Sequence, residues 1–248
     1  MRKPAIITSL LLLLAGSALA QTFTTAQDIM DAVSATPEPV TLQATLDMTI
    51  TSANGQSLSR TLRMWSEGDD RRVIKFIAPA DIAGSGFLSL ERPDGSSENM
   101  IYLPALDRVR RIAGGQQGDS FFGSDFSYSD MTGIDPDEYS HSLLETRDGP
   151  TYIIEAVPLP DSESPWERLL LEVPHDTLIP ARVDYYLNGT AVRTLTTSDV
   201  SKVDGYLLAR ERRMDNLLSG SHTLIRQSEM TLDEDIPAEV FSERFLRR

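Results

Sequence analysis

The chain has 248 residues, of which 40% are hydrophobic and 24% are charged, a composition typical of a folded protein with a sizeable core. The 37 acidic residues outnumber the 23 basic ones, so the formal net charge of −14 repels polyanions and excludes a nucleic-acid-binding protein. Cysteine is absent and only three histidines occur, which excludes disulfides, thiolate zinc sites and cysteine nucleophiles and argues against a histidine-rich metal site.

The first 20 residues have the pattern of a secretory signal peptide. Arg2 and Lys3 precede an apolar run over residues 6–14, and small residues end at Ala20, where signal peptidase would cleave. The run is shorter than the roughly 20 apolar residues that a membrane-spanning helix needs. We therefore expect export to the periplasm, cleavage after Ala20 and no transmembrane segment in the mature chain. Gln21 follows the cleavage site, so a lipoprotein's acylated cysteine is not expected.

The mature chain opens with one short helix and then changes to the period of a β-strand. Thr25, with Asp28 three residues later, predicts a helix N-terminus followed by apolar residues at helical spacing. From residue 40 to residue 50, apolar and polar side chains alternate, which is typical of a half-buried strand. Asn54-Gly55 then predicts a hairpin turn, because both residues tolerate a positive φ.

Further strand candidates occupy most of the chain between residues 58 and 112 and between residues 151 and 232. Short connections rich in Gly and Pro separate them, so sequence neighbours are expected to pair antiparallel. Pro237 predicts a last short helix. We therefore predict a mainly β (α+β) fold with an open, curled antiparallel sheet of about ten or eleven strands, in one domain that covers residues 21–248.

Residues 114–137 interrupt the strands with the longest stretch that lacks either periodicity. Long ordered loops often carry function. The aromatic residues of this stretch are Phe121, Phe122, Phe126 and Tyr128. They predict either a mobile lid over the mouth of a cavity, with glycines as hinges, or a rigid loop that fills the core. Asp125 is a candidate N-cap for a short helical turn within the loop.

Two central stretches and the C-terminal residues are similar to a known family. They are LPALDRVRRI at residues 103–112, FGSDFSY at residues 122–128, and Ile236-Pro237 followed by Phe241. Together with the signal peptide, the opening helix and the antiparallel strands, they make the chain resemble the outer-membrane lipoprotein-sorting (LolA-like) family, especially its exporter-associated branch. The resemblance implies a half-barrel sheet whose concave face is covered by short helices and encloses an apolar cavity for acyl chains.

The resemblance also implies carriage rather than catalysis. The best-known members accept a triacylated lipoprotein from an inner-membrane releasing complex and pass it to an outer-membrane acceptor. Members of the exporter-associated branch are thought to serve a lipid exporter of the resistance-nodulation-division (RND) type. The present sequence is longer than the best-known carriers and differs in its Arg-rich segment, so the cargo is open between a lipoprotein and another acyl lipid.

The inward side chains of the clearest strands are the expected lining of such a cavity, because each buried methylene of an acyl chain contributes about 0.8 kcal/mol. The expected lipid-binding residues are Leu46, Met48, Leu62, Met64, Ile74, Phe76, Leu88 and Leu90. The alternative is that these residues form an ordinary filled core. A slip of one residue in strand register would also exchange the two faces of the sheet.

Arg108, Arg110 and Arg111 form a local positive cluster in an acidic chain. Strand alternation places Arg108 and Arg110 on one face and Arg111 on the other. These residues are candidates for binding a phosphate or carboxylate head group, or an acidic partner surface. The alternative is a set of exposed ion pairs with neighbouring carboxylates.

These observations favour a monomeric periplasmic carrier, without cofactor or metal, that binds the acyl chains of a lipid or lipoprotein and moves them between the inner and outer membranes. Expected partners are an inner-membrane exporter or releasing complex and an outer-membrane acceptor. The alternative is an accessory protein that docks on an RND-type lipid exporter or an envelope-stress regulator without carrying lipid. Reversing the charges of Arg108, Arg110 and Arg111 would then abolish partner capture.

An enzyme is not expected. A serine hydrolase would use Ser120 as its nucleophile, yet the sequence around Ser120 lacks the strand and the G-x-S-x-G pattern of a nucleophile elbow. The three histidines, His141, His175 and His222, show no recognisable triad order. The acidic stretches at residues 135–138 and 233–235 lack the spacing of a calcium loop.

Overall fold

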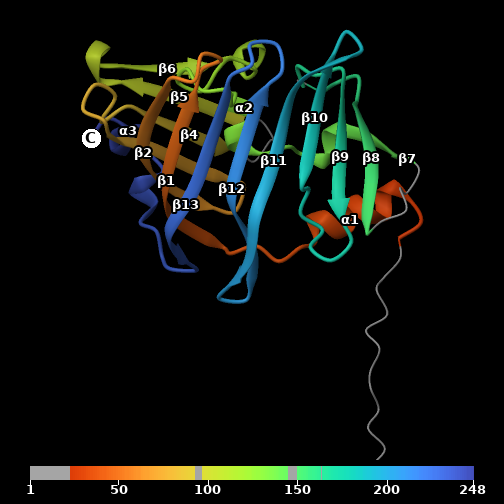
Figure 1. The fold of residues 1–248 in the computed structure, drawn as a ribbon. Helices are drawn as coiled ribbons and strands as arrows, with labels where there is room; N and C mark the ends of the chain where they lie inside the picture. Colours follow the sequence, from red (N-terminus) through yellow and green to blue (C-terminus); the bar gives the residue numbers. More distant parts are fainter. Residues whose placement is uncertain (1–22, 93–96, 145–149, 163) are drawn as a thin grey trace, which may run out of the picture.

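The computed structural model describes residues 23–92, 97–144, 150–162 and 164–248 (Figure 1). The predicted signal peptide, residues 1–20, lies outside the described residues. Within the described ranges, no helix combines the length and the apolarity that crossing a bilayer requires.

The described strands form one open antiparallel sheet of 13 strands in the order β6-β5-β4-β3-β2-β1-β13-β12-β11-β10-β9-β8-β7. Strands that follow one another in sequence pair, except β6 and β7, which lie at the two edges of the sheet. The pairing of β1 with β13 joins the two halves of the chain. The strands are β1 (Thr41–Thr51), β2 (Ser57–Glu67), β3 (Arg71–Ala78), β4 (Gly86–Glu91), β5 (Ser97–Leu103), β6 (Arg108–Ile112), β7 (Tyr139–Leu144), β8 (Thr151–Pro158), β9 (Arg168–Pro174), β10 (Arg182–Leu187), β11 (Thr190–Val203), β12 (Tyr206–Asn216) and β13 (His222–Leu232). The predicted open, curled antiparallel sheet is confirmed.

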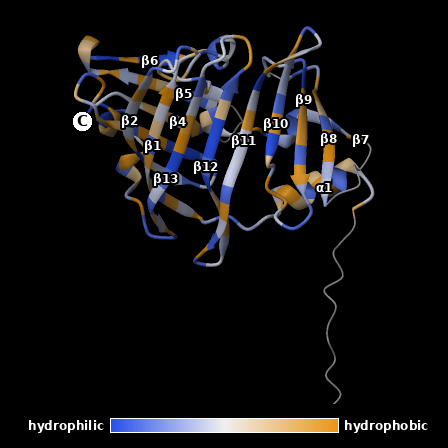
Figure 2. Cartoon of the chain, in the orientation of Figure 1, coloured by the Kyte–Doolittle hydropathy of each residue, from blue (hydrophilic) through white to orange (hydrophobic). Residues whose placement is uncertain are grey.

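Alternation of side chains defines the two faces of this sheet (Figure 2). In β1, Ala44, Leu46 and Met48 are buried, whereas Asp47 is exposed between them. The predicted opening helix is also present as α1 (Ala26–Ser34), and its N-cap Thr25 accepts a hydrogen bond from the Asp28 N–H. The local sequence therefore specifies both elements.

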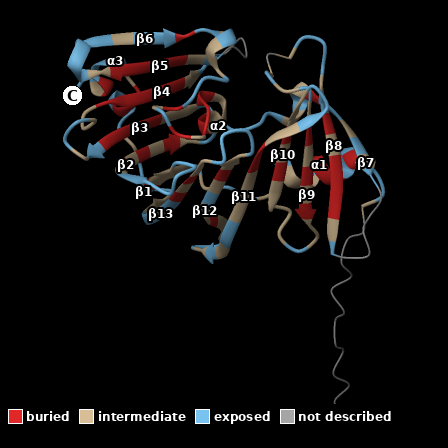
Figure 3. Cartoon of the chain, turned by 45° about the horizontal axis from the view of Figure 1, so that its top comes forward, coloured by how far each residue is buried: buried red, intermediate tan, exposed pale blue. Residues whose placement is uncertain are grey.

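A connecting segment, residues 113–138, joins the two edge strands of the sheet, β6 and β7. It contains η2 (Gly114–Gln116), α2 (Tyr128–Thr132) and η3 (Pro136–Glu138). Because β6 and β7 lie at opposite ends of the strand order, this segment must cross the sheet, and it does so on the concave face (Figure 3). Helix α1 contacts β7 and packs into the same core. One large hydrophobic cluster thus fills most of the concave side.

The C-terminal residues cover the convex face of β3, β4 and β5. They form η4 (Ala238–Val240) and α3 (Glu243–Leu246), with Ser242 as the N-cap of α3. A second, smaller hydrophobic cluster lies beneath them and consists of Val73, Leu88, Met100, Tyr102, Phe241 and Leu246. These strands are therefore buried on both faces.

Burial on both faces corrects two of the expected lining residues. Leu88 is fully buried in the convex cluster, and Leu90 packs against that cluster from its edge. Phe87 takes the inward position of β4, opposite Ile74 of β3. Successive residues of β4 are apolar because the C-terminal residues cover its convex side. The strand therefore has no alternation of polar and apolar residues that would indicate which side chains face the concave side.

The sheet has 13 strands, more than the ten or eleven expected, and β7 at its edge is a strand that the sequence pattern did not indicate. Residues 139–144 form β7, where polar and apolar side chains mix and only Tyr139 is buried. An edge strand that pairs on one side needs little apolar surface, and polar edges also limit association with other chains. The hydrophobic pattern alone therefore missed it.

Gly86 in β4 provides a test of the C-terminal packing. A Cβ atom at this position would lie 2.8 Å from Leu246 Cδ1 and 3.1 Å from the Ile74 carbonyl oxygen. We expect Gly86→Ala to lower the free energy of unfolding by about 1–3 kcal/mol, because an overpacked site must shift its neighbours. Chemical denaturation measures the change. Gly115→Ala is the matched control, since its Cβ would meet nothing within 4 Å, and an equal loss in both variants would contradict this packing.

Candidate functional site

A pocket of about 550 Å³ lies between the β5–β6 hairpin and the connecting segment. Its lining residues are Ile101, Leu103, Leu106, Arg108, Val109, Arg110, Phe122 and Tyr128. Six of the eight are apolar or aromatic, and two are arginines. This volume falls in the range of roughly 300–1,000 Å³ that is typical of small-molecule sites. The pocket therefore has an apolar wall and a cationic rim, a combination that suits an amphiphilic ligand.

Strand pairing explains why the two arginines lie beside apolar residues. Arg108 pairs with Leu103 across the hairpin, and Arg110 pairs with Ile101. Directly opposite residues of an antiparallel pair share a face of the sheet. Both arginine side chains are exposed, so they reach solvent at the rim.

Arg111 points to the other face, as the strand period predicted. Its guanidinium contacts Glu98 at 2.6 Å, and Arg92 contacts the same carboxylate at 2.6 Å. The hydrogen bond from Arg92 and the charges of both arginines lower the pKa of Glu98. The predicted arginine cluster is thus divided: Arg111 belongs to an ion-pair network, and Arg108 and Arg110 belong to the pocket.

Phe122 forms the wall opposite the hairpin in an unusual backbone conformation. Its φ of 49° lies in the left-handed region, which costs a non-glycine residue energy. Arg60 Nη1 of β2 donates a hydrogen bond of 2.5 Å to its carbonyl oxygen. The ring lies 4.7 Å from the ring centroid of Phe76 and 6.2 Å from that of Tyr128. Packing and this hydrogen bond together hold the half-buried ring at the pocket.

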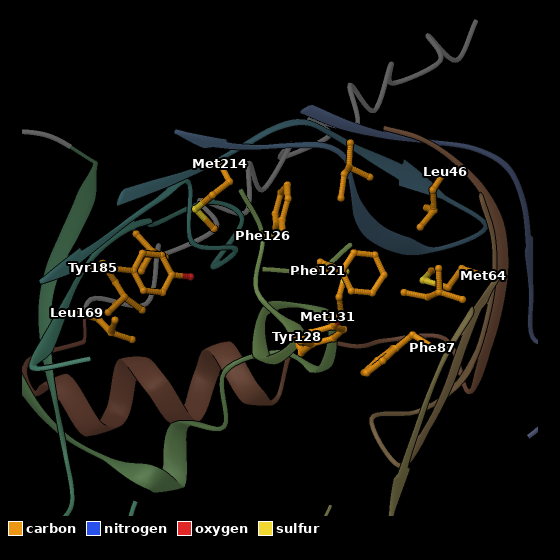
Figure 4. Packing of buried hydrophobic residues seen from close by; sticks show 14 of the residues in the cluster. Leu46, Met64, Phe87, Phe121, Phe126, Tyr128, Met131, Leu169, Tyr185 and Met214 are labelled. Atoms are coloured by element: carbon orange, nitrogen blue, oxygen red, sulfur yellow. The ribbon is translucent and has the colours of Figure 1, made fainter. Parts of the chain in front are cut away.

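The other aromatic residues of the connecting segment fill the core. Phe121 is 0% exposed, Phe126 2% and Tyr128 5%. In Figure 4 their side chains lie between the residues of β1, β2 and β4 on one side and those of β9, β10 and β12 on the other. The rigid-loop alternative therefore describes these three residues in this structure, whereas Phe122 lies at the boundary of the pocket.

The expected lining residues on β1, β2 and β3 belong to this filled core. All six are buried in the concave cluster: Leu46, Met48, Leu62, Met64, Ile74 and Phe76. None of them lines the 550 Å³ pocket. Their inward direction was predicted correctly, but the connecting segment occupies the space in front of them. The pocket lies instead at the β5–β6 end of the sheet, where the segment leaves room.

Polar contacts fix the connecting segment to strands that are distant in sequence. Asp125 accepts hydrogen bonds from the hydroxyls of Thr223, at 2.7 Å, and Ser221. Arg72 of β3 donates to the Met131 carbonyl oxygen. Arg193 of β11 pairs with Asp130 at 2.7 Å. The segment is thereby attached to both halves of the sheet.

Asp125 is not the N-cap of the short helix that was expected here. Ser127 caps α2, and its hydroxyl accepts from the Asp130 N–H while the Asp130 carboxylate accepts from the Ser127 N–H. This reciprocal capping box requires a polar side chain directly before the helix and an acid three residues later. Ser127 and Asp130 have that spacing, and Asp125 lies two residues too early.

Ser120 has the environment of a structural serine. Its hydroxyl donates a 2.6 Å hydrogen bond to the Ser124 carbonyl oxygen, within a loop closed by a bridge to Ser127. His175 stacks on Tyr152 at 3.9 Å between ring centroids, and His141 lies on β7. No group of three or more metal-ligating side chains occurs in the part of the chain that the structure describes.

Sequence reasoning missed four walls of the pocket: Ile101, Leu103, Leu106 and Val109. Their signal was present, since all four lie beside the arginines in the β5–β6 hairpin, although the Val109 side chain itself packs against the convex cluster. It was not usable, because an apolar residue on a strand has the same pattern whether it faces a pocket or a packed core.

Comparisons with known proteins agree with the fold. A family model that is described as an uncharacterized protein matches residues 68–248, more than half of the chain. No curated protein matches the chain. A crystal structure described as an outer membrane lipoprotein-sorting protein domain from Vibrio parahaemolyticus has a TM-score of 0.82 and 25% identity, covering 90% of this chain and 98% of that one.

Two further crystal structures are similar over the same length. A DUF1329 family protein from Desulfovibrio piger has a TM-score of 0.83 and 29% identity, covering 89% of this chain and 97% of that one. A LolA superfamily protein from Nitrosomonas europaea shares the fold, with a TM-score of 0.73 and 18% identity, covering 90% of this chain and 100% of that one. The open sheet, its covered concave face and these similarities lead to one conclusion: the chain belongs to the family whose model matches residues 68–248, and it has the fold of the LolA superfamily.

Proposed function

We propose that this protein is a periplasmic carrier that binds an acyl chain in the pocket between the β5–β6 hairpin and the connecting segment. The pocket of about 550 Å³ with six apolar or aromatic walls is the observation that carries the proposal. Similarity in fold to an outer membrane lipoprotein-sorting protein domain and the predicted signal peptide support it. Transfer between the inner and outer membranes follows as the proposed role.

The size of the pocket suits one chain. If a methylene occupies the roughly 30 Å³ of a water molecule, about 18 such groups fill the 550 Å³ pocket. A shorter chain of about 12 methylene groups therefore fits, and burying it contributes roughly 10 kcal/mol. Association costs at least about 4 kcal/mol in lost freedom of motion, which leaves a Kd in the tens of micromolar from the chain alone. A carrier that must release its load needs an affinity of this moderate order.

Mass spectrometry of the mature protein under native conditions, taken from its own periplasm, tests the proposal directly. We expect one acyl lipid per protein, which organic extraction then identifies. An unchanged protein mass, together with no saturable binding of a fluorescent fatty-acyl probe, would contradict acyl carriage and favour the docking alternative.

A pocket variant makes the test specific to this site. We expect Leu103→Trp to weaken binding of the fluorescent fatty-acyl probe at least tenfold, because the larger ring fills the apolar end of the pocket. Leu58→Trp on β2 is the control, since Leu58 is 44% exposed and does not line the pocket. Equal probe affinities in the two variants would place the acyl chain elsewhere in the protein.

A further inference from the structure

We propose that the pocket selects acyl compounds whose head group is a phosphate, and that Arg108 and Arg110 bind this phosphate. The inference rests on the proposed acyl-binding function and specifies its ligand class. It predicts that the chain alone binds weakly and that the head group supplies the discrimination.

Arg108 and Arg110 have no charged partner in the part of the chain that the structure describes. The chain has 37 acidic residues to 23 basic ones, so carboxylates are abundant. Arg111, one residue away, pairs with Glu98 at 2.6 Å. Across the described ranges of the chain, by contrast, neither Arg108 nor Arg110 makes an ion pair or a side-chain hydrogen bond. Two exposed guanidiniums thus remain free to bind an external anion.

The two charges lie beside the apolar residues of the pocket. Each arginine lies opposite an apolar wall residue, Leu103 or Ile101. Burial raises the pKa of the Tyr128 hydroxyl, and the nearby charge of Arg110 acts in the opposite direction. Arg110 lines the same pocket as Phe122 and Tyr128, the aromatic residues that the connecting segment contributes. A ligand whose chain contacts these walls presents its head group at the arginines.

Two neighbouring guanidinium groups suit a phosphate in spacing and in hydrogen bonding. Residues two apart on a strand are roughly 7 Å apart and point to the same face, so two long guanidinium side chains can converge on one phosphate. A guanidinium binds phosphate through two parallel hydrogen bonds, which is stronger and more directional than its contact with a neutral hydroxyl. The overall negative charge of the protein repels anions at distances where salt does not screen it, so selection depends on these local contacts.

A pair of ligands that differ only in the phosphate tests the inference. Lauroyl lysophosphatidic acid and monolauroyl glycerol carry the same acyl chain, and isothermal titration below their micellar concentrations measures both affinities. We expect the phosphate-bearing ligand to bind at least tenfold more tightly, which corresponds to about 1.4 kcal/mol. We expect that preference to fall as ionic strength rises, because the two charges are at the rim.

Variants of the three arginines separate this inference from the proposed function. Arg108→Gln with Arg110→Gln is expected to abolish the preference for the phosphate-bearing ligand. Arg111→Gln, which lies outside the pocket, is expected to retain both this preference and the binding of monolauroyl glycerol. Circular dichroism confirms that each variant folds, since exposed substitutions change stability little. Equal affinities in the unmodified protein, or a preference that survives the double substitution, would overturn the inference while leaving acyl binding intact. If neither ligand binds, the proposed function itself fails. Inorganic phosphate that binds as tightly as lysophosphatidic acid would also overturn the inference, because the chain would then contribute nothing.

Discussion

Phe121→Ala is expected to lower the free energy of unfolding by about 3–5 kcal/mol, the range for removing a fully buried phenyl ring. The ring is 0% exposed and lies 5.8 Å from the Phe87 ring centroid and 5.7 Å from that of Tyr128. Its loss leaves a cavity in the middle of the concave core. Urea denaturation followed by circular dichroism measures the change, and an unaltered slope shows that the substitution acts on the folded state.

Phe122→Ala is the matched control, one residue along the same segment. Its ring is half-buried at the pocket, so we expect a loss of only about 1 kcal/mol, about half of what full burial contributes. If Phe121→Ala destabilises the protein no more than Phe122→Ala, the connecting segment leaves the concave face in solution and acts as a lid. The expected inequality instead means that the connecting segment packs on the concave face in solution as it does in the structure.

Arg193→Met is expected to cost about 3–5 kcal/mol, because it leaves the buried Asp130 carboxylate without its cationic partner. The side chains of Arg193 and Asp130 are 9% and 6% exposed, and their atoms are 2.7 Å apart. The guanidinium also stacks between the rings of Trp166 and Tyr185, at 4.1 and 4.2 Å from their centroids. This pair therefore holds the connecting segment on β11.

The double variant Arg193→Met with Asp130→Asn distinguishes the charge from the packing. We expect it to lose less stability than the sum of the two single variants, because no unpaired charge remains buried. Glu211→Gln, which breaks the exposed pair of Glu211 with Arg226, is the control and is expected to cost less than about 1 kcal/mol. Additive single-variant losses would show that Arg193 and Asp130 act independently, contrary to the direct pair in the structure.

The connecting segment is a packed and hydrogen-bonded part of the core. The 550 Å³ pocket, with its apolar residues and its two arginines, lies beside the segment at the β5–β6 end of the sheet. Binding there requires no unfolding of the segment. Phe122 is the one aromatic residue of the segment that combines a left-handed backbone with partial exposure, and it lines this pocket.

Local sequence was sufficient for most elements. The alternation of β1, the N-cap of α1 and the position of the β5–β6 hairpin each follow from spacing and residue type, because they depend on contacts between near neighbours. The separation of Arg111 from Arg108 and Arg110 follows from the strand period alone. Strand β7 escaped this reasoning because its polar side chains carry no hydrophobic pattern.

The sequence by itself determined that this protein is a mainly β chain with an open antiparallel sheet and an arginine pair on one strand face. Only the tertiary structure decided which apolar residues face a pocket. Phe87 points inward and Leu88 outward because the C-terminal helix covers the convex side of β4, some 150 residues later in the chain. Likewise, the buried residues of β1 and β2 do not line the 550 Å³ pocket, because the connecting segment crosses in front of them. Alternation specifies the two faces of a strand, but the element that covers each face is set by contacts between distant parts of the chain.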